Sequence, residues 1–371
     1  MAQVVHKLTP FAAGAREIRT PEKDLGRAEP QGLAALGATP RRKIALPGPE
    51  DVVVDHEWGI AFISSQERTR PLNQTSRAGA IYALDLNKED ALCVNLMTKK
   101  LLRTIGSFHP LGLDLFMVDG KERRLAVVNH AEGGCRIEIF TVLREDDGLP
   151  RLEHVCSLGP HELLTNPNGV AIASRNEVYV TNPRDLRALF NPWLYLKDML
   201  HLRSGRILSC RFTDDGKATW AIADEGLSYP NGIAINRQGA RPRVYVAVMN
   251  AKQIRMYAPA PDGRLERSGK AVDLPAMPDN LCLDRDGDLW IGASPDLLKA
   301  VLYFAGCRKT SPSAVLRISQ PQSVKPVVET VFFDGGELIS GSSVGCPYAD
   351  GNRSKLLVGS VIENLLIVDL R

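Results

Sequence analysis

The chain has 371 residues, of which 44% are hydrophobic and 24% charged, and its formal net charge is +3 at pH 7. This is the composition of a globular protein, and so small and evenly spread a charge argues against nucleic acid as a partner. No stretch reaches the roughly 18 apolar residues that a membrane span needs, so no membrane span is expected.

The first part of the chain, residues 1–40, mixes charges, proline and glycine without a sustained hydrophobic period, and is expected to be an N-terminal arm. It contains no apolar core of signal-peptide length. The seven cysteines lie far apart without a C-x-x-C pair, which argues against zinc or thiol redox chemistry and favours buried free thiols. These features predict a cytoplasmic protein.

From residue 41 to residue 371 short β-strands dominate the pattern. They are rich in valine, isoleucine and aromatic residues, alternate polar with apolar positions, and are separated by glycine, asparagine, aspartate and proline. The clearest strand segments are residues 51–64, 123–131, 135–143, 176–182, 243–250, 287–293 and 355–370.

One segment, residues 186–205, breaks the β pattern with a broad apolar stripe. Pro192 within it should start or kink a helix rather than lie in its interior. The segment predicts one helical element, packed either on the rim of the domain or as a lid over its centre.

A weak internal repeat indicates how the predicted strands are arranged. A polar pair or triplet opens a strand of small apolar residues six times, at intervals of roughly 60 residues, which suits a four-stranded blade with its loops. We therefore predict an all-β fold, a six-bladed β-propeller over residues 41–371, whose innermost strands begin at one end of a central channel. The six starts are at Glu50, Phe108, Asn168, Asn231, Asp279 and Ser342.

Polar side chains at these starts would converge on one point in the channel. Calcium prefers oxygen ligands and accepts carboxylates, asparagine carbonyls and water in flexible geometry, whereas soft metals do not favour such a set. The sequence thus predicts a central calcium ion with an open position, able to polarise a carbonyl or phosphoryl oxygen of a substrate. The predicted ligands are Glu50, Asn168, Asn231, Asp279 and Asn280.

Several stretches share their order and spacing with a known family. Examples are PEDVVVDHEWGIAFIS (49–64), NPNGVAIASRNEVYVTN (166–182) and MPDNLCLDRDGDLWIGASPD (277–296). From about residue 45 to the C-terminus the chain resembles the paraoxonases, calcium-dependent lactonases and arylesterases, and more distantly the gluconolactonase and regucalcin group. The resemblance implies a six-bladed propeller with two calcium ions in its channel.

Carried over by position, the resemblance implies that the catalytic ion falls on the same five residues. The deeper, structural ion would use Asp51 and the backbone carbonyl of Leu113, but its second carboxylate position is Gly169. Since the number of charged ligands tunes calcium affinity, we expect one catalytic ion and a weakened or empty second site.

The base that activates water differs from the family pattern. Paraoxonases use a histidine in a P-H-G-I stretch, supported by a second histidine, whereas this chain has Leu111 at the first position and His130 at the second. Leucine cannot accept a proton, so three substitutes remain open: His109, His130 and Asp279. Asp279 would either deprotonate water or attack the substrate directly.

These residues predict a calcium-dependent hydrolase of lactones or aryl esters that acts on a small molecule. One alternative is a specialised pathway enzyme on the same calcium site, such as a phosphotriesterase, an isomerase or a lactonising enzyme. Another is a non-catalytic ligand-binding propeller resembling strictosidine-synthase-like proteins. Neither the substrate nor the oligomeric state follows from the sequence. The loops of a propeller determine its specificity, and their sequence alone does not identify the ligand.

Overall fold

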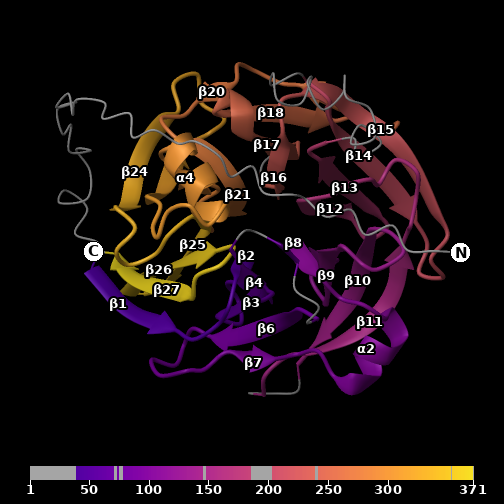
Figure 1. Cartoon of the computed structure of the whole chain (residues 1–371). Coiled ribbons are helices and arrows are strands. Elements are labelled where there is room, and N and C mark those ends of the chain that lie inside the picture. Colours follow the sequence, from indigo (N-terminus) through magenta and orange to yellow (C-terminus); the bar gives the residue numbers. More distant parts are fainter. Residues whose placement is uncertain are drawn as a thin grey trace, which may run out of the picture. The chain divides into compact units, whose positions relative to one another are not determined.

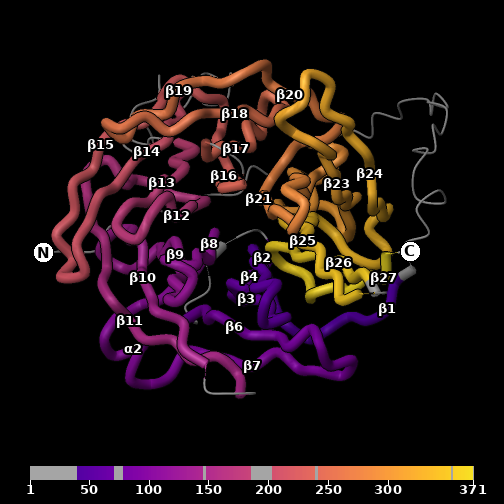
Figure 2. Tube along the Cα trace, turned by 180° about the vertical axis from the view of Figure 1, so that it is seen from behind, coloured from indigo at the N-terminus to yellow at the C-terminus, as the bar shows by residue number. Residues whose placement is uncertain are grey.

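The computed structural model describes residues 39–70, 73–74, 78–144, 148–184, 203–238, 241–351 and 353–370. All of them belong to one compact unit, residues 32–371. Their strands form six sheets of four or five strands arranged in a ring, seen along its axis in Figure 1 and from behind in Figure 2, and one separate two-stranded sheet. The predicted six-bladed β-propeller is confirmed.

Each blade is an antiparallel meander whose innermost strand comes first along the chain in blades one to five. The first three blades consist of β2 (Pro49–Asp55), β3 (Ile60–Ser65), β6 (Ala80–Asp85) and β7 (Val94–Asn95); β8 (Pro110–Val118), β9 (Glu122–Asn129), β10 (Arg136–Leu143) and β11 (Arg151–Leu158); and β12 (Val170–Ser174), β13 (Glu177–Asn182), β14 (Gly205–Phe212) and β15 (Ala218–Leu227).

The remaining blades continue in the same way, and the sixth is completed by the first strand of the described chain. They consist of β16 (Pro230–Asn236), β17 (Arg243–Val248), β18 (Gln253–Pro259) and β19 (Leu265–Arg267), with β20 (Val272–Asp273) also on β18; β21 (Met277–Leu283), β22 (Leu289–Ser294), β23 (Ser313–Ser319) and β24 (Val327–Asp334); and β25 (Ser342–Asp350), β26 (Arg353–Ser360), β27 (Leu365–Leu370) and β1 (Thr39–Ile44).

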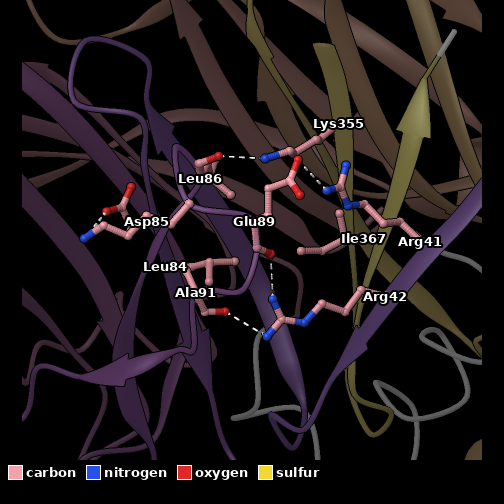
Figure 3. Close-up of a pocket in the computed structure, with 10 residues that line it drawn as sticks. Arg41, Arg42, Leu84, Asp85, Leu86, Glu89, Ala91, Lys355 and Ile367 are labelled. Atoms are coloured by element: carbon pink, nitrogen blue, oxygen red, sulfur yellow. Dashed lines mark hydrogen bonds and ion pairs between the residues drawn. The ribbon is translucent and has the colours of Figure 1, made fainter.

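Strand β1 pairs with β27, so the two ends of the described chain share one sheet. Figure 3 shows how β1 is also tied to the first blade. Arg42 donates to the carbonyl oxygens of Glu89 and Ala91, each at 2.9 Å, and Arg41 forms ion pairs of 3.1 Å with both Glu89 and Asp369. The ring is therefore closed by hydrogen bonds at the junction of blades one and six.

Few helices accompany the blades in the described part of the chain. They are α2 (Lys99–Ile105), α4 (Leu297–Phe304) and the 3-10 turn η2 (Met249–Ala251). The side chains of Thr98 and Asp296 cap the N-termini of α2 and α4, as such residues commonly do. The sequence did not predict either helix. None of the described helices is both long and apolar enough to cross a membrane.

Two predictions concern segments that the description covers only in part. The predicted helical element at residues 186–205 lies outside the described residues except for its last three positions, 203–205, of which Gly205 begins β14. Residues 1–38 also lie outside the description, so the N-terminal arm of residues 1–40 stays a prediction.

The cysteines depart from the sequence-based expectation of free thiols. Cys282 on β21 and Cys346 on β25 form a disulfide between two neighbouring blades, with their Cα atoms 5.4 Å apart. Their separation along the chain, 64 residues, gave no indication of pairing. Among the described residues, the free cysteines are Cys93, Cys135, Cys156, Cys210 and Cys307.

Candidate active site

The innermost strands β2, β8, β12, β16, β21 and β25 contact one another in ring order around the centre. In five of them the pairing with the next strand shifts at the very start, for example between Pro49 and Asp51 and between Pro278 and Leu281. Such β-bulges redirect side chains and often adjoin active sites. The bulges thus place the first residues of the inner strands toward one end of the channel.

Glycines allow these strand starts to approach one another closely. A Cβ atom on Gly232 would lie 2.5 Å from the carbonyl oxygen of Asp279, and one on Gly169 would lie 2.8 Å from that of Asn231. Since a real Cβ atom cannot come so near a backbone oxygen, only glycine fits at these positions. The Asn-Gly pairs that resemble plain turn signals are therefore points of contact between blades.

The predicted oxygen ligands meet at this end of the channel, although they are far apart in the sequence. Asn280 Nδ2 donates to Glu50 Oε1 at 3.0 Å across 230 residues, and Asn231 Nδ2 donates to Asp279 Oδ1 at 2.6 Å. The backbone oxygen of Asn168 accepts a hydrogen bond from the inner strand of the preceding blade. The structure thus brings together residues from blades one, three, four and five.

Four oxygen atoms of this cluster are buried without a hydrogen-bond partner: Glu50 Oε2, Asn168 Oδ1, Asn231 Oδ1 and Asn280 Oδ1. Buried polar atoms are nearly always satisfied, so each exception calls for an explanation such as a missing ion. In the described part of the chain no three His, Cys, Asp or Glu side chains gather closely enough to hold a metal by themselves. An ion here would depend on the three asparagine amides, which suits calcium.

The carboxyl groups of the cluster are strongly perturbed. Burial raises the pKa of Glu50, and burial followed by the charge of Glu50 raises the pKa values of Asp51 and Asp279 well above their ordinary range. Arg68 opposes this effect at Glu50. Three buried carboxyl groups that repel one another destabilise their ionised forms unless a cation compensates them. The electrostatics therefore also favour a bound cation.

The deeper site implied by the family resemblance has a single carboxylate, Asp51, which already accepts backbone hydrogen bonds on both oxygens. Asp51 Oδ1 accepts a hydrogen bond from the backbone N–H of Val52 at 2.9 Å, and Asp51 Oδ2 accepts one from Leu113 at 3.0 Å. Both carboxylate oxygens are thus already satisfied by backbone groups. Gly169 offers no side-chain oxygen, and the space beside it is filled by Asn231 and Ile233.

Restoring a carboxylate at Gly169 is accordingly expected to fail. Gly169→Asp should lower the free energy of unfolding by about 1–3 kcal/mol, because its Cβ atom would push against the backbone of β16. Urea unfolding measures the loss, and calorimetric titration with calcium measures the stoichiometry. Gly169→Ala is the matched control for steric strain alone. A variant that keeps wild-type stability and binds one more calcium ion than wild type would contradict this interpretation.

The two candidate histidines lie beside the cluster. His109 is buried, and its Nδ1 atom lies 2.7 Å from Gln66 Nε2, which can only donate, so the lone pair of Nδ1 is occupied. His130 Nε2 lies 2.7 Å from the carbonyl oxygen of Pro167 and donates to it. Burial lowers the pKa of both histidines. In both imidazoles burial thus disfavours the protonated form, and both make positioning hydrogen bonds.

These contacts affect the three candidate bases differently. His130 can accept a proton only at Nδ1, because its Nε2 atom donates to Pro167. His109 could accept a proton at Nδ1 only after losing its hydrogen bond from Gln66. Asp279 lies within the oxygen cluster itself, where Asn231 orients its carboxyl group. Leu111, at the position of the usual histidine, packs against the apolar cluster between blades two and three. The geometry therefore favours Asp279 among the bases.

The comparison with known proteins agrees with this architecture. The crystal structure of a candidate gluconolactonase superposes with a TM-score of 0.51 at 16% identity, covering 90% of this chain and 92% of that chain. At this level of identity the likeness concerns the fold alone. The likeness thus agrees with the six-bladed propeller fold of this chain.

The family follows from the sequence. The family model described as Arylesterase matches residues 54–370, so the chain belongs to the arylesterase family. It is 29% identical to human serum paraoxonase/arylesterase 1, over 84% of this chain and 83% of that protein. It is 31% identical to rat serum paraoxonase/arylesterase 2, over 87% and 86% respectively. The chain is an ester or lactone hydrolase by family.

Proposed function

We propose that the protein is a calcium-dependent hydrolase of lactones or aryl esters. The observation that carries this proposal is the set of four buried, unpartnered oxygen atoms on Glu50, Asn168, Asn231 and Asn280. These residues and Asp279 would hold one calcium ion. When bound, the ion would supply a Lewis acid that polarises the substrate carbonyl and stabilises the negative charge that develops on its oxygen.

The side chains around the cluster have separate tasks in the proposed reaction. Asp279 takes a proton from the attacking water as general base. Asn231 holds the carboxyl group of Asp279 in place through its amide N–H group, and Asn280 does the same for Glu50. The amide oxygens of both asparagines are left without a hydrogen-bond partner. His130 is a positioning residue, because its hydrogen bond to Pro167 fixes the residue directly before Asn168.

The experiment that tests the function combines metal removal with a substrate panel. Purified protein is stripped with a chelator, and hydrolysis of aliphatic lactones, aromatic lactones and aryl esters is followed before and after calcium is restored. We expect activity only with calcium, and calorimetric titration should give one ion per chain. Full activity of the metal-free protein would overturn the proposal. Calcium binding without any turnover would instead favour a ligand-binding propeller.

A further inference from the structure

A buried arginine lies beside the oxygen cluster and has no role in the reaction proposed above. Arg68 is 7% exposed. It belongs to the short strand β4 (Arg68–Thr69), which pairs with β5 (Asn73–Gln74) directly after β3 and lies next to β2 and β3 near the centre in both views. A cation so deeply buried requires compensation, because the desolvation of a charge is costly.

Arg68 is fixed at the channel end of the first two blades. The chain leading to it stays beside the start of β2, where the N–H of Gln66 donates to the carbonyl oxygen of Gly48 at 3.2 Å. Arg68 Nη2 then reaches across to the start of β8 and donates to the carbonyl oxygen of Pro110 at 3.2 Å. The guanidinium therefore spans the two strand starts that carry Glu50 and His109.

The hydrogen-bonding capacity of Arg68 is incomplete. Its Nη1 atom is buried without a hydrogen-bond partner, and no ion pair joins Arg68 to a carboxylate of the described residues. Its charge acts to lower the pKa values of Glu50, His109 and His130. An unpaired, buried Nη1 group beside the site of carbonyl chemistry is suited to accept an anionic group of a ligand.

We infer that Arg68 is a specificity-determining residue that binds a carboxylate carried by the substrate, so that the preferred substrates are anionic lactones or esters. This inference rests on the proposed function, since it names the substrate class of the same site. A carboxylate near the scissile carbonyl would complete the hydrogen bonds of Nη1. It would also neutralise a cation that would otherwise add to the positive charge of a bound calcium ion.

The kinetic test compares a γ-butyrolactone that carries a γ-carboxylate with its uncharged γ-carboxamide, using calcium-loaded protein. We expect wild type to prefer the carboxylate by about ten- to a hundredfold in kcat/KM, the range of a charge-assisted hydrogen bond. Arg68→Met should abolish the preference and change kcat/KM for the carboxamide by less than about threefold. Arg68→Lys should retain part of it. The matched control is Arg70→Met, which removes an exposed arginine two residues further along.

A binding measurement separates this inference from the hydrolase proposal. Tetrahydrofuran carboxylate and tetrahydrofuran carboxamide contain no ester or lactone bond, and their affinities are measured by calorimetry with the same variants. Tighter binding of the carboxylate that depends on Arg68 supports the inference even if no lactone or ester is turned over, a result that would overturn the hydrolase proposal alone.

Two results would overturn the role of Arg68. The first is an equal loss of affinity for both probes in Arg68→Met, which would make Arg68 a structural counter-ion of Glu50. The second is a preference that survives in Arg68→Met, which would assign the carboxylate to the metal. Thermal unfolding confirms that the variants fold, and Arg68→Gln replaces Arg68→Met under the same criteria if the latter does not.

Discussion

Glu50→Gln is expected to abolish calcium binding and to lower kcat/KM about a thousandfold. Glu50 contributes the carboxylate that faces Asn280, and one of its oxygens is buried without a partner. A metal ion that stabilises the transition state contributes several kcal/mol, and about 4 kcal/mol corresponds to a factor of a thousand. Calorimetric titration with calcium and steady-state kinetics measure the two losses, and Glu266→Gln at an exposed site on β19 is the matched control.

The stability of the same variant should move in the opposite direction when calcium is absent. The pKa of Glu50 is raised in the folded protein, so its protonated form is favoured there and its ionisation destabilises the fold as the pH rises above about 4.5. Gln removes this charge, and the calcium-free variant should have a higher Tm than calcium-free wild type at pH 7 and an equal one near pH 4. A lower Tm of the calcium-free variant at pH 7 would contradict a cation-binding role.

Asp279→Asn is expected to reduce kcat by roughly a hundredfold to ten-thousandfold, the usual contribution of a general base. Burial and the charge of Glu50 raise the pKa of Asp279, so the wild-type rate should fall on the acidic side of the pH profile as this group becomes protonated. The variant should lose that acidic limb. The rate is measured over pH at saturating calcium, which separates the loss of the base from weakened metal binding.

Two further variants complete this comparison. Asp286→Asn, in the exposed hairpin at the other end of β21, controls for the substitution and should leave the profile unchanged. His130→Gln should lower the rate by less than tenfold while retaining the acidic limb, because its amide can still donate to Pro167. An acidic limb that disappears in His130→Gln and persists in Asp279→Asn would assign the base to His130.

The fold could be predicted because each blade repeats the same local pattern. Strands such as β9, β10 and β22 are short runs rich in valine, isoleucine and leucine, and the polar starts of the inner strands recur at one phase of the repeat. The position of these polar residues within the repeat also predicted that their side chains would meet at one end of the channel. Proline directly precedes all four polar residues Glu50, Asn168, Asn231 and Asp279. In three of these cases, all except Asn168, the proline lies at the bulge that opens the inner strand.

Other features could not be read from the sequence, because they depend on contacts between distant segments. Arg68 follows a β-strand and would ordinarily be taken as an exposed residue. Only the fold shows that it donates a hydrogen bond to the carbonyl oxygen of Pro110 at the start of the next blade. The occupied lone pair of His109 depends on Gln66, 43 residues earlier. The disulfide between Cys282 and Cys346 likewise results from two neighbouring inner strands, whose order around the ring the spacing of cysteines does not reveal.

The pairing of β1 with β27 has a consequence for work with this protein. Glu50 lies only six residues after the end of β1, and Asn280, which holds it, belongs to a blade on the other side of that junction. Expression tags, truncations or fusion partners placed near residue 39 would therefore disturb the pairing of β1 with β27, close in sequence to Glu50. The two ends of the described residues, β1 and β27, are therefore as important for protein engineering as the channel, although no residue of β1 is a candidate ligand.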